Sequence, residues 1–123
     1  MVDPYTPEAM TLRLANVTFD CDDVLKVAEF WSAALGRSLD PDASDFFASI
    51  GLTDDDLPNW FFAKVPEAKV TKNRVHVDLA TDDREAEIAH LVGLGATRGQ
   101  DHDEWGHSWT VMADPEGNEF CVS

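Results

Sequence analysis

The feature that most restricts how this chain can fold is a diverged internal repeat with a spacing of sixty residues. Residues 12–20 and 74–80 each alternate apolar and polar side chains, which is typical of a half-buried β-strand. An aspartate pair and then apolar residues at spacings of three and four follow each segment, and this pattern predicts a helix. When the chain is aligned with itself at a shift of sixty residues, Asn16 is equivalent to His76. Because β-like segments follow each helix, the sequence predicts an α+β fold of two tandem βαβββ modules.

Capping residues mark the ends of both predicted helices. The Asp22–Asp23 pair supplies N-cap chemistry for the first helix, and Gly36 is the expected left-handed residue after its last turn. In the second repeat, Asp82 and Glu85 fit a capping box and Gly95 ends the helix. The apolar positions expected to face the core are Val24, Val27, Ala28, Trp31, Ala34 and Leu35 in the first helix and Ile88, Leu91 and Val92 in the second.

The strands are predicted from alternation and from runs of aromatic and β-branched residues. Val75, Val77 and Leu79 are expected on one face of the strand at 74–80, with His76 and Asp78 on the other. A strong turn is expected at residues 114–118. The further strand segments are 37–40, 46–50, 60–65, 96–99, 107–112 and 119–122.

The charge of the chain excludes two classes of partner. There are 24 Asp and Glu residues against 9 Lys and Arg, a formal net charge of −15. A field of this sign repels phosphate backbones and anionic lipid headgroups, so neither nucleic-acid binding nor membrane-surface binding is expected. The N-terminus lacks the basic segment of a secretory signal, and no apolar run approaches the roughly 18 residues of a membrane helix. Two cysteines do not make a disulfide framework, so we expect a cytoplasmic protein.

Four stretches carry a resemblance to a known superfamily: VTFDCDD leading into FWSAALG, then VPEAKVTKNRVHVDL, LVGLGA, and WTVMADPEGNEFCV. The chain resembles the vicinal-oxygen-chelate superfamily, which includes glyoxalases, bleomycin-binding proteins and extradiol dioxygenases, and within it the small glyoxalase-like domain branch. The resemblance implies a single domain over residues 1–123, with modules at about 12–66 and 73–123. It also implies that the modules form a curved, partly open mixed sheet around a cavity.

The same resemblance identifies four positions where metal-dependent members place ligands. Here they are occupied by Asn16, approximately Ala63, His76 and Cys121. Only His76 is the residue expected of such a member. Because a catalytic zinc or iron site needs about three suitable protein donors, we expect no functional metal and no other cofactor.

Several residues are candidates for the cavity lining: Asn16, Thr18, Asp20, Phe62, His76, Asp78, Trp105 and Cys121. His76 and Asp78 can do acid–base chemistry together, or Asp78 can hold a structural histidine. Asp20 is either a cavity carboxylate or a cap for the following turn. Cys121 is either a nucleophile or a buried thiol. The stretch 102–107 is expected to be a loop at the cavity mouth, with Trp105 as a lid over a flat ligand.

Three functions remain compatible with these residues. We expect a protein that binds a small molecule, cationic or aromatic in character, in the cavity without metal. The alternatives are a metal-dependent lyase, isomerase or dioxygenase of the same superfamily, and a metal-free enzyme using His76 and Asp78. The basic segment Lys72-Asn73-Arg74 fits either folding or a subunit contact, and the residues do not decide whether the chain forms a homodimer.

Overall fold

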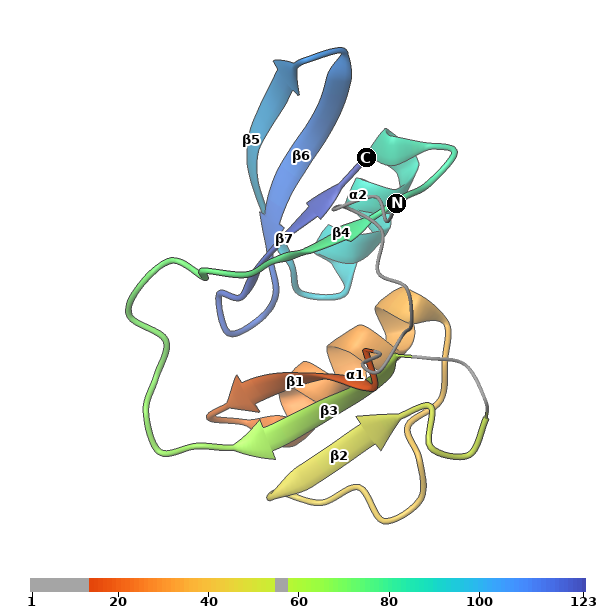
Figure 1. The fold of residues 1–123 in the computed structure, drawn as a ribbon, viewed down its shortest axis with the longest axis vertical. Coiled ribbons are helices and arrows are strands. Elements are labelled where there is room, and N and C mark those ends of the chain that lie inside the picture. Colours follow the sequence, from red (N-terminus) through yellow and green to blue (C-terminus); the bar gives the residue numbers. More distant parts are fainter. Residues whose placement is uncertain (1–13, 55–57) are drawn as a thin grey trace, which may run out of the picture.

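The computed structural model describes residues 14–54 and 58–123, which form two modules of one helix and one open mixed sheet each (Figure 1). The predicted α+β class and its two-module organisation are confirmed. The order of elements is β1 (Asn16–Cys21), α1 (Val24–Leu35), β2 (Phe47–Ile50), β3 (Asn59–Lys64), β4 (Val77–Leu79), α2 (Arg84–Gly93), β5 (Thr97–Glu104), β6 (His107–Ala113) and β7 (Glu119–Val122). Within the described ranges, neither helix has the length and apolar character needed to span a membrane.

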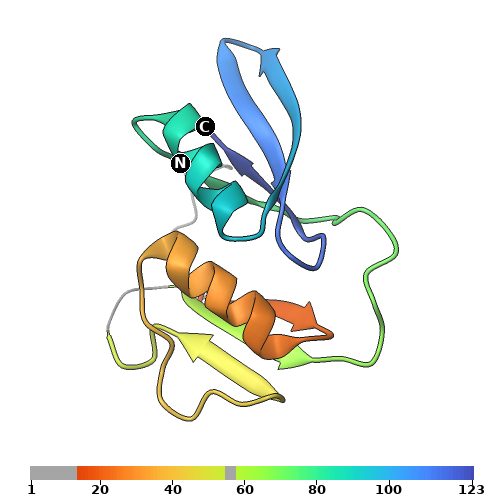
Figure 2. The same cartoon turned by 180° about the vertical axis from the view of Figure 1, so that it is seen from behind.

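Both sheets place a parallel strand pair next to antiparallel partners. In the first module the order is β1-β3-β2, with β1 parallel and β2 antiparallel to β3. In the second the order is β4-β7-β6-β5, with β4 parallel to β7. Each helix covers one face of its own sheet, as the view from behind shows (Figure 2). Among the described residues, no helix covers the opposite face of either sheet.

The first helix begins and ends as its sequence predicts. The side chain of Asp23 accepts a hydrogen bond from the backbone N–H of Lys26, and Gly36 adopts a left-handed φ of 66°. In α2 the predicted capping box is wrong. Asp83, not Asp82, is the N-cap, and Glu85 instead forms two hydrogen bonds to Arg98 on β5.

Three apolar or strand predictions also need correction. Residues 37–40 are not a strand, because Asp40 turns inward and its carboxylate accepts hydrogen bonds from Ser49, Leu52 and Thr53. The segment at 74–80 pairs only over β4, and Val75 before it is 82% exposed. Val92 is 47% exposed, because α2 buries only Ile88 and Leu91.

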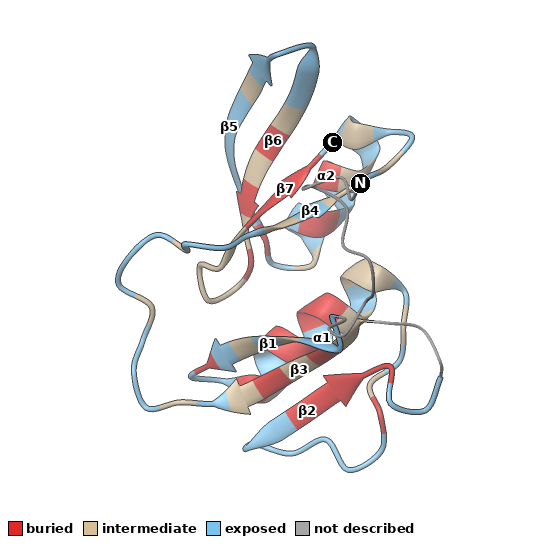
Figure 3. Cartoon of the chain, in the orientation of Figure 1, coloured by how far each residue is buried: buried red, intermediate tan, exposed pale blue. Residues whose placement is uncertain are grey.

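The core lies between the helices and their sheets, and α1 joins the two modules (Figure 3). Trp31 of α1 is fully buried and stacks on Trp60 of β3, with ring centroids 5.3 Å apart. The same indole meets Phe120 of β7 edge to face at 4.9 Å. Phe30, which the helical pattern did not mark as a core position, also contacts Phe120. One helix face therefore contributes to a single hydrophobic core that the two modules share.

The turn between β6 and β7 is fastened to α1 by two carboxylates. Asp114, only 3% exposed, accepts a 3.0 Å hydrogen bond from the indole N–H of Trp31. It also accepts hydrogen bonds from the backbone N–H groups of Glu116 and Asn118, which fixes the turn. Glu116 then accepts hydrogen bonds from the backbone N–H groups of Asp22 and Asp23, just before α1. The negative charge of Glu116 is favourable at this helix N-terminus.

A conservative substitution tests this connection. Trp31→Phe keeps a ring in the core but removes the donor to the buried carboxylate of Asp114, so we expect a loss of about 1–3 kcal/mol in the free energy of unfolding. Urea denaturation measures the change. Trp105→Phe is the control, because Trp105 is 87% exposed and its replacement should alter stability by less than about 0.5 kcal/mol. Equal effects of the two substitutions would contradict the role given to Trp31.

Candidate functional site

A cavity of about 610 Å³ lies on the open face of the second sheet, opposite α2. Alternate residues of adjacent strands point into it, because side chains on a strand alternate between the two faces of a sheet. Val111 of β6 is paired with Cys121 of β7, so these two residues lie side by side on its floor. The residues around the cavity are Lys72, His76, Asp78, His102, Trp105, His107, Ser108, Trp109, Val111, Glu119, Cys121 and Ser123.

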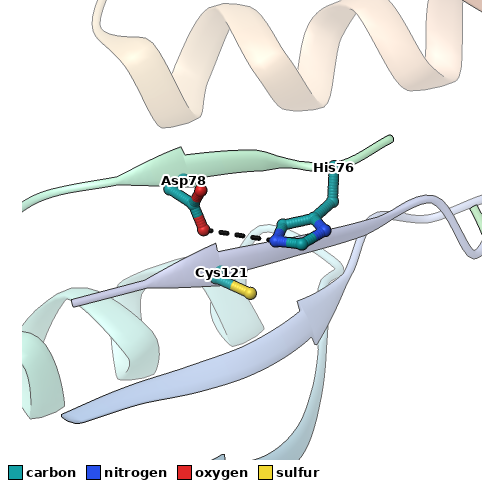
Figure 4. A group of neighbouring side chains, drawn as sticks. All are labelled: His76, Asp78 and Cys121. Carbon is teal, nitrogen blue, oxygen red and sulfur yellow. Dashed lines mark ion pairs between the residues drawn. The ribbon is translucent and has the colours of Figure 1, made fainter. Parts of the chain in front are cut away.

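Three side chains that can act as acids, bases or metal ligands meet at one end of this cavity (Figure 4). Asp78 on β4 is paired with Cys121 on β7, and His76 precedes β4 on the same side. His76 Nε2 lies 3.4 Å from Asp78 Oδ1. One donor atom from each of the three residues lies within 4.8 Å of the others. His76 and Asp78 are exposed, with side-chain exposures of 42% and 72%, whereas Cys121 is 5% exposed.

The electrostatics of this group keep Cys121 a thiol. Burial raises the pKa of Cys121, and the charge of Asp78 and a hydrogen bond to its carboxylate raise it further. The positive charge of Lys72 acts in the opposite direction and lowers it. The net effect is upward, so Cys121 is not an activated nucleophile, which agrees with the buried-thiol alternative.

Glu119 fixes the chain segment that leads into His76. It accepts hydrogen bonds from the Lys69 ammonium at 3.0 Å and from the backbone N–H of Asn73 at 2.9 Å. The backbone N–H and the Lys69 ammonium together hold the pKa of the Glu119 carboxyl below its ordinary value, against the opposing effect of burial. The basic segment that contains Lys72 is thereby held beside the cavity, and Lys72 forms part of its lining.

The other end of the cavity is a hairpin, not the loop expected at 102–107. A β-bulge between Arg98 and Asp101 shifts β5 by one residue and turns His102 to the cavity face. His102 is then paired with Trp109 of β6, and their rings stack at 5.3 Å and 17°. Gly99 is needed within this bulge, because a Cβ there would lie 2.8 Å from the carbonyl oxygen of Val111.

A second cavity, of about 660 Å³, lies between β1 and the segment that joins the modules. Thr18 and Asp20 line it, as expected for the polar face of the first strand. His76, Lys72 and Glu119 line both cavities. The candidate residues are thus divided between the two cavities. Thr18 and Asp20 line only the second cavity, Asp78, Trp105 and Cys121 line only the cavity of the second sheet, and His76 lines both.

Two of the candidate residues lie elsewhere. Phe62 is fully buried in the core, where it packs against Phe19, so its assignment to the cavity is wrong. Trp60, two residues earlier on the same strand, is 8% exposed and also belongs to the core. Phe61 is the aromatic of β3 that points away from α1, because it alternates with its neighbours. Asn16 is exposed at the start of β1 and lines neither cavity.

Four lining residues on β6 were not among the predicted candidates: the alternating His107, Trp109 and Val111, and their neighbour Ser108. Their alternation within the strand was visible, but which face it presents depends on the pairing with β7. His102 and His107 lie on different strands, β5 and β6. The turn at 105–106 pairs Glu104 with His107, which brings both histidines to one face of the hairpin. Gly99 was the available signal for the bulge.

The four positions that the family resemblance marks as metal ligands do not form a metal site in this structure. Asn16 and Ala63 belong to the first sheet, and Ala63 has no side-chain donor. His76, Asp78 and Cys121 offer a different donor set, entirely within the second module. In a tetrahedral zinc site the donors lie roughly 3.5 Å apart, so this trio would have to contract from separations of up to 4.8 Å.

Comparisons with known proteins agree with this fold. The family model described as a glyoxalase-like domain matches residues 16–123, so the chain belongs to the glyoxalase-like domain family. The predicted membership of the vicinal-oxygen-chelate superfamily is confirmed. No curated protein matches the sequence significantly.

Solved structures of this superfamily superpose over most of the chain. A glyoxalase/bleomycin resistance protein/dioxygenase family enzyme from Burkholderia phytofirmans is 17% identical, with a TM-score of 0.72 over 90% of this chain and 97% of its own. A possible glyoxalase from Bacillus cereus is 17% identical, with a TM-score of 0.69 and coverages of 91% and 98%. The bleomycin-binding protein of Streptomyces verticillus, complexed with copper(II)-bleomycin, is 15% identical, with a TM-score of 0.64 and coverages of 94% and 98%. At such identities the likeness establishes the fold.

Thiol alkylation tests the electrostatics of the site. Asp78→Asn removes a negative charge that raises the pKa of Cys121, so iodoacetamide at pH 8 should modify Cys121 roughly threefold faster. Lys72→Met removes the opposing charge and should slow the reaction. Peptide mapping separates Cys121 from Cys21, which is fully buried with its pKa raised to about 12, mainly by burial, and serves as an internal reference. Rates that change in the same direction in both variants would contradict this arrangement.

Proposed function

We propose that this protein binds a small organic molecule in the cavity of the second sheet, without a metal. The observation that most strongly supports this proposal is the set of residues that line the cavity. It combines aromatic rings at the hairpin end with His76, Asp78 and Cys121 at the other, within about 610 Å³. This size, and a mainly apolar floor with a few polar groups, are typical of small-molecule sites.

Binding is favoured over metal-free catalysis by the state of the candidate chemical groups. Asp78 is largely exposed, so its contact with His76 is weakened by water. The pKa of Cys121 is raised, which leaves the site without a ready nucleophile. His76 and Asp78 are therefore proposed to orient a ligand through hydrogen bonds. The copper(II)-bleomycin complex of one structural neighbour supports ligand binding as a use of this fold.

A second function has one specific observation in its favour. His76, Asp78 and Cys121 provide nitrogen, oxygen and sulfur donors, and three protein donors are the number that a catalytic zinc site requires. A metal-dependent lyase, isomerase or dioxygenase would use that trio. The protonated state of Cys121 opposes this alternative, since a thiol must lose its proton to bind the metal.

Matched cavity-filling variants test the proposal. Val111→Phe fills the floor of the cavity in the second sheet, and Thr18→Phe occupies the other cavity. A library of small metabolites is screened by the thermal shift of the unaltered protein, and the hits are measured by calorimetry. Hits should lose at least tenfold in affinity with Val111→Phe and keep it with Thr18→Phe. The reverse pattern, or the absence of hits, would overturn the assignment of this cavity.

Elemental analysis of the same preparations distinguishes the two functions. Binding without metal predicts far less than one equivalent of zinc, iron, manganese, nickel or copper per chain. A chelator should then leave both the melting temperature and the affinity of the hits unchanged. One equivalent of metal that disappears with Cys121→Ser, together with a fall in melting temperature, would establish the metal-dependent alternative instead.

A further inference from the structure

The turn of the β5–β6 hairpin contains a residue that folding alone does not explain. Trp105 and Gly106 both have positive φ values, 53° and 75°, in a two-residue turn of the I′ kind. Such turns favour Asn-Gly or Asp-Gly, because a bulky side chain is unfavourable in the left-handed region. A tryptophan at the first position is therefore a strained choice.

Burial does not compensate for that strain. The side chain of Trp105 is 87% exposed, so its large apolar surface remains in water. The contact that orients it is Trp109, whose ring lies 6.4 Å away and is nearly parallel, at 14°. An exposed apolar ring in a strained turn at the edge of a cavity indicates a contact that forms only with a ligand.

The three rings of the hairpin form one set of nearly parallel planes. His102 stacks on Trp109 from β5, and Trp105 lies beside Trp109 from the turn, within 17° and 14° of its plane. We call these three residues the hairpin ladder. All three line the cavity of the second sheet, and Val111 continues that floor from Trp109 toward Cys121. A flat molecule stacked on the hairpin ladder can therefore extend toward His76 and Asp78.

The charges around the hairpin ladder favour a cation. On β5, Glu104 lies on the same face as His102, whereas Asp101 and Asp103 point to the opposite face. The guanidinium of Arg98, the one arginine of this strand, is already hydrogen-bonded to Glu85 and Asp101. The fixed positive charge of the cavity, Lys72, acts on Cys121 at the other end. Indole faces also attract cations, and the net charge of −15 brings cations toward the protein.

We propose that the hairpin ladder is a stacking subsite for a planar aromatic cation. The inference rests on the proposed binding function and adds the chemical class of the ligand. Trp105 is held in the open by the turn so that one face remains available to stack on the aromatic plane. Asp78 at the far end is placed to accept hydrogen bonds from the polar groups of the same molecule.

Two substitutions at one position test the subsite, with proflavine as the planar cation. Trp105→Asn creates the Asn-Gly sequence that suits this turn, so the melting temperature should rise by a few degrees while proflavine binding weakens roughly tenfold. Trp105→Ala should weaken binding equally without stabilising the fold. Phe46→Ala is the control, since it removes a 75% exposed ring from the first module and should leave binding unchanged. Equilibrium dialysis gives the affinities.

Two further probes separate shape from charge. Anthracene-2-carboxylate is planar and anionic, and dicyclohexylammonium is cationic without an aromatic plane; both should bind at least tenfold more weakly than proflavine. Equal binding of either probe would overturn the class proposed here. If proflavine binds equally to all Trp105 variants but is lost with Val111→Phe, the hairpin ladder is not the subsite, although the cavity still binds ligands. If no probe or library hit is affected by Val111→Phe, the proposed function fails as well.

Discussion

The buried hydrogen bond from Trp31 to Asp114 is the interaction on which the rest of the structure depends. It joins the helix of the first module to the turn that precedes β7 in the second. Asp114 organises that turn, and β7 starts five residues later with Glu119. The positions of Cys121 on the cavity floor and of Glu119 beside it therefore depend on how α1 packs. A buried carboxylate is costly unless its donors are all present, which makes this contact sensitive to small changes.

As a consequence, the two modules have different roles despite their similar architecture. The first module supports the second: Trp31 packs against both β3 and β7, and the backbone N–H groups before α1 donate hydrogen bonds to Glu116. The second contains the candidate site, since His76, Asp78, Cys121 and the hairpin ladder all belong to it. The divergence of the repeat agrees with these different roles. At equivalent positions the first module has Asn16 and the second has His76.

Local signals in the sequence were sufficient for much of the fold. The bounds of α1 follow from its aspartate cap, its apolar spacing and Gly36, and β7 follows from the turn before it. The predictions that were wrong concerned which side chains face the core or the cavity, and these depend on strand pairing and helix packing between distant segments. Which of Phe61 and Phe62 enters the core depends on which side of β3 the helix covers. The third donor, Asp78, joins Cys121 only through the pairing of β4 with β7. The placement of His102 depends on one bulged residue, and alternation alone cannot reveal such a shift.

In the proposed function, the ligand occupies the open face of the second sheet. The four tryptophans report on it directly, because Trp105 and Trp109 line that face while Trp31 and Trp60 are buried in the core. The decisive measurement is a proton–nitrogen correlation spectrum of the labelled protein titrated with proflavine. The indole N–H signals of Trp105 and Trp109 should shift with increasing ligand, together with the backbone signals of Val111 and Cys121, while those of Trp31 and Trp60 stay in place. Shifts confined to residues 17–20 and 65–75 would place the ligand between the modules and contradict the account.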